Sequence, residues 1–148
     1  MILTITIKLC FGINAKGDWQ ATIELDEDTL LVDLHGIIQQ AVEFDDDHLF
    51  DFYLANAPMS REKERFDEEN EGVYDRTIGS FFPLPKGKKF FYFFDWGDSW
   101  VFRVSKERKK PFEPKPDLFY PYLVDEKGER PPQYDFDEEH ISMWEVGS

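Results

Sequence analysis

Residues 89–105 read KFFYFFDWGDSWVFRVS, and this stretch decides the fold. Two apolar runs, 89–95 and 99–105, flank a short polar turn that contains Gly97, a residue that tolerates positive φ. The pattern therefore predicts a β-hairpin. Aromatic residues fill every position from 90 to 94, which is typical of a central strand that is covered on both faces. The residues expected to be structural in this hairpin are Phe94, Trp96, Gly97 and Trp100.

Two further strands are expected at the start of the chain. Apolar and polar residues alternate over 2–11, which predicts a half-buried strand. A turn rich in glycine and asparagine at 12–18 separates this strand from a second one at 19–25. We expect the two to form an N-terminal hairpin.

Residues 29–43 carry an apolar stripe at helical spacing, which predicts the main helix. Asp28 or Thr29 can cap its start. Gly36 inside the helix costs about 1 kcal/mol relative to alanine. A close packing contact at Gly36 would explain why that cost is tolerated.

The remaining segments complete an α+β fold. We expect a strand at 48–54, a charge-dense loop at 60–75, a brief edge strand at 77–79 and an irregular C-terminal tail from 117. The prediction is an α+β domain with a mixed or antiparallel sheet of about five strands, one main helix and that irregular tail. Residues 1–148 are expected to form a single domain.

Composition points to a soluble cytoplasmic protein. A chain of 148 residues with 17% aromatic content can bury a core without disulfides or metals. Its single cysteine, Cys10, lies in an apolar run and is expected to be a buried, inert thiol. No apolar run approaches the roughly 20 residues of a membrane span, and no basic region precedes the apolar start. We expect no membrane partner and no cofactor.

The net charge of −14 is unevenly distributed. Residues 86–115 hold nine Lys and Arg against four Asp and Glu, whereas the rest of the chain is strongly acidic. An acidic field repels phosphates, which disfavours nucleic acid as a partner. A basic partner protein, or a basic loop of the chain packed against an acidic one, fits this charge better, although the sequence does not identify a partner.

Asp95 and Asp98 are the first candidates for chemistry. Two carboxylates three residues apart across a glycine turn can converge on a cation or act as an acid/base pair. The alternative is that they cap the turn by accepting hydrogen bonds from backbone N–H groups, which the local sequence favours.

Two histidines extend this candidate polar site to His35, His48, Asp95 and Asp98. His35 flanks the helix stripe, and His48 follows three aspartates. Each is either a packed, hydrogen-bonded residue or part of a His/carboxylate metal site. No spacing demands a metal, and neither a nucleophile elbow nor a phosphate-binding loop is present. Catalytic residues are therefore not assigned.

Four segments of the chain together resemble a known family. They are Leu-His-x-x-Ile-Gln at 34–39, His-Leu-x-x-Phe at 48–52, the hairpin FDWGDSW at 94–100 and Gly-x-Arg-Pro-Pro at 128–132. In order and spacing they resemble the plasmid pRiA4b ORF-3-like family, also labelled an insertion-element passenger TnpR family. The resemblance implies a compact α+β domain with a mixed or antiparallel sheet and few helices, and it carries no established activity.

The transposon-related label suggests a resolvase, which this sequence does not fit. A serine resolvase needs an N-terminal nucleophilic serine, whereas the first serine here is Ser60. The tail after Pro132 also lacks the glycine pair usual in the family. The resulting hypothesis is a binding or interaction domain without an evident catalytic constellation. The alternative is a metal-assisted hydrolase or nucleic-acid-processing enzyme that uses the His/Asp site, so enzyme activity stays open.

Overall fold

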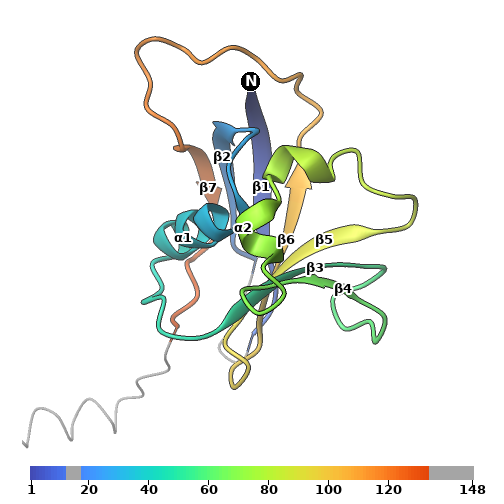
Figure 1. Ribbon diagram of the computed structural model, residues 1–148. Helices are drawn as coiled ribbons and strands as arrows, with labels where there is room; N and C mark the ends of the chain where they lie inside the picture. The colour runs from blue at the N-terminus through green and yellow to red at the C-terminus, as the bar shows by residue number, and fades with distance from the viewer. Residues whose placement is uncertain (13–17, 134–148) are drawn as a thin grey trace, which may run out of the picture.

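The computed structural model describes residues 1–12 and 18–133, which build one seven-stranded antiparallel sheet with its main helix on one face (Figure 1). The strands are β1 (Ile2–Phe11), β2 (Gln20–Asp26), β3 (Phe50–Ala55), β4 (Glu64–Phe66), β5 (Lys89–Phe94), β6 (Trp100–Lys106) and β7 (Tyr122–Lys127). Their order in the sheet is β4-β3-β5-β6-β1-β2-β7. The helices are α1 (Leu31–Val42), the short α2 (Gly72–Asp75) and the 3₁₀ helix η1 (Ile78–Phe81).

The expectation of about five strands is wrong, because this sheet has seven. A mixed sheet is also wrong, because every pairing is antiparallel, whereas the α+β class broadly fits. Both missed strands lie at the edges. β4 is three residues long and lies inside a charge-dense segment. β7 lies within the expected irregular tail, and its side chains are almost all exposed, so it lacks the alternation that marks a half-buried strand. Residues 134–148 of that tail lie outside the described part of the chain.

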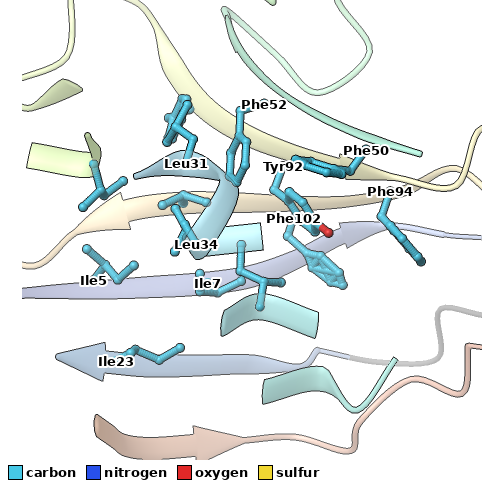
Figure 2. Packing of buried hydrophobic residues seen from close by; sticks show 14 of the residues in the cluster. Ile5, Ile7, Ile23, Leu31, Leu34, Phe50, Phe52, Tyr92, Phe94 and Phe102 are labelled. Carbon is cyan, nitrogen blue, oxygen red and sulfur yellow. The ribbon is translucent and has the colours of Figure 1, made fainter. Parts of the chain in front are cut away.

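The central strand β5 is covered on both faces, as its aromatic run predicts. Tyr92 and Phe94 point into the main core, which packs under α1 (Figure 2). Phe90 belongs to the same core. Phe91 and Phe93 point to the other face of the sheet. There they form a second buried cluster with Tyr53, Ala55 and Val101.

In the β5–β6 turn, the residues with positive φ angles differ from the predicted one. Positive φ angles occur at Asp95 (65°) and Ser99 (55°), and Gly97 has none. A Cβ on Gly97 would lie 3.3 Å from the Asp95 Oδ1 atom, so the glycine makes room for that carboxylate. The prediction that Gly97 supplies the positive φ is therefore wrong.

The start of α1 also departs from expectation. The helix begins at Leu31, and neither Asp28 nor Thr29 caps it with its side chain. Thr77 forms an isolated bridge with Leu30 and leads into η1, so the edge strand expected at 77–79 is absent. No helix among residues 1–12 and 18–133 combines the length and hydropathy needed to cross a membrane.

Cys10 is exposed in a bulge of β1, which corrects the expectation of a buried thiol. Partial burial of its sulfur still raises the pKa of the thiol above its ordinary value. The reactive thiolate is therefore not favoured.

Replacing Gly36 by alanine is expected to stabilise the protein by about 1 kcal/mol, because a Cβ there would meet nothing within 4 Å. This also shows that the close packing contact expected at Gly36 is absent. Urea unfolding followed by circular dichroism measures the change. As a contrast, Gly128→Ala should destabilise, since Gly128 has a φ of 81° and a Cβ there would lie 1.8 Å from the Asp18 carbonyl oxygen. A Gly36→Ala variant that is no more stable than wild type would contradict this view of the α1 surface.

Candidate functional site

A closed ring of four hydrogen bonds joins α1, the loop after it and the central strand. His35 Nδ1 lies 2.5 Å from the Tyr92 hydroxyl group, and His35 Nε2 lies 2.5 Å from Asp46 Oδ1. Gln39 Nε2 donates to the same hydroxyl at 2.8 Å, and Gln39 Oε1 accepts from the Asp46 backbone N–H at 2.9 Å. His35 and Gln39 are one helical turn apart and thus share a face of α1.

The chemistry of the partners assigns the protons in this ring. A carboxylate only accepts, so Nε2 of His35 carries the proton and donates to Asp46. The Tyr92 hydroxyl then donates to the unprotonated Nδ1 and accepts from Gln39. Burial lowers the pKa of His35 although the Asp46 charge opposes this, which favours the neutral ring that the network needs.

The ring has the appearance of an Asp–His–Tyr relay, but its hydroxyl group is out of reach of any ligand. Tyr92 is completely buried, and burial raises its pKa well above the ordinary value. Figure 2 shows its ring among Phe50, Phe94 and Phe102. His35 also stacks on Phe50 with ring centroids 3.6 Å apart. Such a network serves to satisfy buried polar atoms.

The other three candidate residues form a second group at the β5–β6 turn. Asp95 Oδ1 accepts hydrogen bonds from the backbone N–H groups of Gly97 (2.9 Å) and Asp98 (3.3 Å). Asp95 Oδ2 lies 3.4 Å from His48 Nε2. The Asp95 backbone N–H donates to the Leu49 carbonyl oxygen, so this residue ties the turn to the start of β3. Asp95 acts here as a turn cap.

The environment of Asp98 differs from that of Asp95. Burial, together with the charge of Asp95, raises the pKa of the Asp98 carboxyl group. Asp95 is almost fully buried, at 4% exposure. The two carboxylates thus differ in solvent access and role.

Members of both groups line one open hollow of about 630 Å³, which we call the acidic hollow: His35 and Asp46 come from the first group and His48 from the second. Its walls come from the start of α1, the loop before β3 and the segment after β4. The lining residues are Val32, His35, Asp46, Asp47, His48, Leu49, Phe50 and Glu68. Among the described residues no three His, Cys, Asp or Glu side chains are placed to hold one metal ion.

Several residues of this region were missed by the sequence-based reasoning. Tyr92 looks like one more ring in an aromatic run, and its partners lie 53 and 57 residues away. Gln133 accepts from the Asp45 N–H at 2.5 Å and donates to Asp47 Oδ1 at 2.7 Å, which holds the end of the described chain against this loop. The spacing of His35 and Gln39 is the one signal that could have indicated a common partner.

Asp51 is a further residue that the sequence did not single out. It lies on the sheet face opposite α1 with 2% exposure, and its Oδ1 atom has no hydrogen-bond partner. Burial raises its pKa to about 6, against the opposing charge of Arg65, whose Nη1 atom is 3.9 Å from Oδ2.

Fold and site together define a class: an antiparallel α+β domain with a polar, acidic hollow beside its central hairpin. The chain belongs to the plasmid pRiA4b ORF-3-like family, whose model matches residues 15–138. The fold is similar to the crystal structure of a protein of unknown function, MM3350, from Methanosarcina mazei Go1, with a TM-score of 0.72 and 22% identity. That similarity covers 98% of this chain and 78% of the other. No curated protein matches the chain.

Tyr92→Phe is expected to destabilise the protein by roughly 1–3 kcal/mol, because it leaves buried donors and acceptors on His35 and Gln39 without partners. Chemical denaturation measures the loss. The matched control is Tyr122→Phe on the exposed strand β7, which should change stability by less than about 0.5 kcal/mol. Equal stability of the two variants would show that the ring contributes nothing to the fold.

Asp51→Asn is expected to change how stability depends on pH. The native carboxyl group holds its proton up to about pH 6, whereas an unfolded one releases it near pH 4. The native state therefore binds more protons across this window, so wild-type stability falls as the pH rises from about 4 to about 6. The loss is on the order of 3 kcal/mol, and the asparagine variant should lack it. Parallel slopes for the two proteins in urea titrations at each pH would refute the assignment.

Proposed function

We propose that the protein is a cytoplasmic, non-catalytic binding domain whose acidic hollow receives a cationic group of a partner protein. The observation that carries this proposal is the charge of the hollow. Asp46, Asp47 and Glu68 line it, and no Lys or Arg of the described chain does. A lysine or arginine side chain of a basic partner fits such a surface.

The apolar part of the hollow suits the stem of such a side chain. Leu49 is 67% exposed at its rim, and Phe50 and Val32 lie in its wall. Lysine and arginine carry aliphatic stems that pack on apolar surface while the charged group stays near water or a carboxylate.

The hydrogen bonds of the candidate residues support binding over catalysis. Both ring nitrogens of His35 are engaged inside the protein, and Asp95 Oδ1 caps a turn. A general base or metal ligand needs a lone pair that faces the ligand. These contacts do not favour the metal-assisted alternative.

Titration with a fluorescein-labelled Lys/Arg-rich peptide tests the proposal. Asp47→Asn combined with Glu68→Gln is expected to weaken binding by about tenfold, because two carboxylates of the hollow lose their charge. The matched control is Glu113→Gln with Asp117→Asn, the same charge change on exposed residues of the β6–β7 connection.

The control separates a site from general attraction to an acidic protein. If both double variants lose affinity equally, the net charge attracts the peptide and the hollow has no special role. If neither loses affinity, the proposed site is wrong.

A further inference from the structure

The sheet face opposite α1 gathers cations that are scattered along the chain. Antiparallel registers place one residue of each strand in a single row across all seven strands. From one edge to the other this row is Arg65, Tyr53, Phe91, Arg103, Lys8, Gln20 and Lys127. With neighbouring strands about 4.8 Å apart, the row spans roughly 29 Å. We call it the basic row.

Several of these cations have no acidic partner. Within residues 1–12 and 18–133, no carboxylate lies at ion-pair distance from Lys8, Arg103 or Lys127. Lys89, which faces the same side beside Ala55, also has none. Arg65 has only Asp51, at 3.9 Å. Burial raises the pKa of the Cys10 thiol, and the charges of Arg103, Lys8 and Lys89 act against that rise.

Aromatic side chains are exposed beside the basic row. The adjacent row runs through Asp51, Phe93, Val101 and Phe11. Phe11 at its end is 46% exposed. Trp96 packs on Phe93 with ring centroids 4.6 Å apart and is itself 50% exposed. The Arg65 guanidinium group lies 4.9 Å from the centre of the Trp96 ring.

Two acidic residues of this face lie toward the β2–β7 edge. Glu24 of β2 is bound to Lys109 at 3.3 Å, and Asp125 of β7 lies one row from Lys127. Near the centre, Glu107 also reaches this face, because the Thr6 hydroxyl group of β1 donates a hydrogen bond to its carboxylate. The basic row itself contains no carboxylate, and Asp51 in the adjacent row is buried.

We propose that this face of the sheet binds single-stranded nucleic acid, with phosphates on the basic row and bases on Trp96 and Phe11. A groove of cations flanked by exposed rings is the arrangement that binds single strands with little sequence preference. An acidic peptide would use the cations but would leave the rings unused. A duplex keeps its bases stacked inside and cannot use the rings either.

The net charge of −14 does not forbid this binding. The Debye length is about 10 Å at 0.1 M salt, so charges on the α1 side are largely screened from a ligand on the opposite face. The acidic residues elsewhere in the protein lower the affinity for nucleic acid and make it depend steeply on salt concentration. This salt dependence can be measured.

Fluorescence anisotropy of a labelled twelve-residue oligothymidylate, titrated at about 50 mM salt, tests the proposal. Wild type should bind, with a slope of log K against log salt of about −2 for three phosphate contacts. Lys8→Glu with Arg103→Glu should weaken binding at least tenfold. Lys86→Glu with Lys110→Glu, the same charge change on exposed loop residues, should weaken it less than threefold. Lys8→Gln with Arg103→Gln replaces the first pair if circular dichroism shows that it is unfolded.

A third variant separates stacking from charge. Trp96→Ala should weaken binding at least fivefold and leave the salt slope unchanged, since a stacked ring contributes without releasing counterions. Absence of binding by wild type would overturn the proposal, as would equal losses in the face and loop variants. Equal affinity for a poly-glutamate peptide or for the matching duplex would also overturn it, because either would show a general anion surface.

Discussion

The hydroxyl group of Tyr92 is the constraint on which the rest of the structure depends. It lies at the centre of the sheet among aromatic rings, where an unpaired hydroxyl would cost roughly 1–3 kcal/mol. Two residues of α1, His35 and Gln39, must reach this one oxygen atom. That requirement sets both the rotation of the helix and its position along the sheet. Asp46 then closes the ring, which fixes the loop that carries the acidic hollow.

Strand alternation explains how one acidic chain carries two faces of different charge. Side chains along β5 and β6 point alternately to the two sides, so Phe102 lies in the core while Arg103 faces out. The register then aligns Arg103 with Lys8 of β1, from the other end of the chain. The acidic residues 45–47 meanwhile stay in a loop on the α1 side. The net charge averages over both faces and describes neither of them.

The sequence predicted the parts of the fold that have a strong periodic signal. The strand at 2–11, the main helix and the hairpin at 89–105 lie where the patterns place them. The edge strands β4 and β7 were not predicted, because an edge strand that buries few side chains needs no alternation of apolar and polar residues. The prediction that Gly97 has the positive φ angle failed because Asp95 adopts the left-handed conformation instead. Aspartate tolerates that conformation better than most residues.

For the site, the sequence pointed to residues but not to their partners. His35 and His48 line the acidic hollow, whereas Asp95 contacts His48 and Asp98 follows Asp95 in the β5–β6 turn, so the four residues form two groups instead of one. Contacts between residues far apart in the sequence separate the two groups: His35 contacts Tyr92, and His48 contacts Asp95. These pairings depend on how the helix and hairpin meet in space. No local spacing in the sequence predicts how the helix and hairpin pack. Tyr92, which contacts both His35 and Gln39, cannot be distinguished from the other rings of its aromatic run.

The position of the acidic loop is itself unfavourable for stability. Residues 45–47 follow the C-terminal end of α1, where the helix dipole is negative and cations are preferred. Glu43 ends the same helix, although Arg130 offsets its charge at 2.9 Å. Local conflict of this kind is expected where function is selected at the expense of stability. A cation bound in the hollow, as proposed above, would offset part of this repulsion through Asp46 and Asp47, which line it.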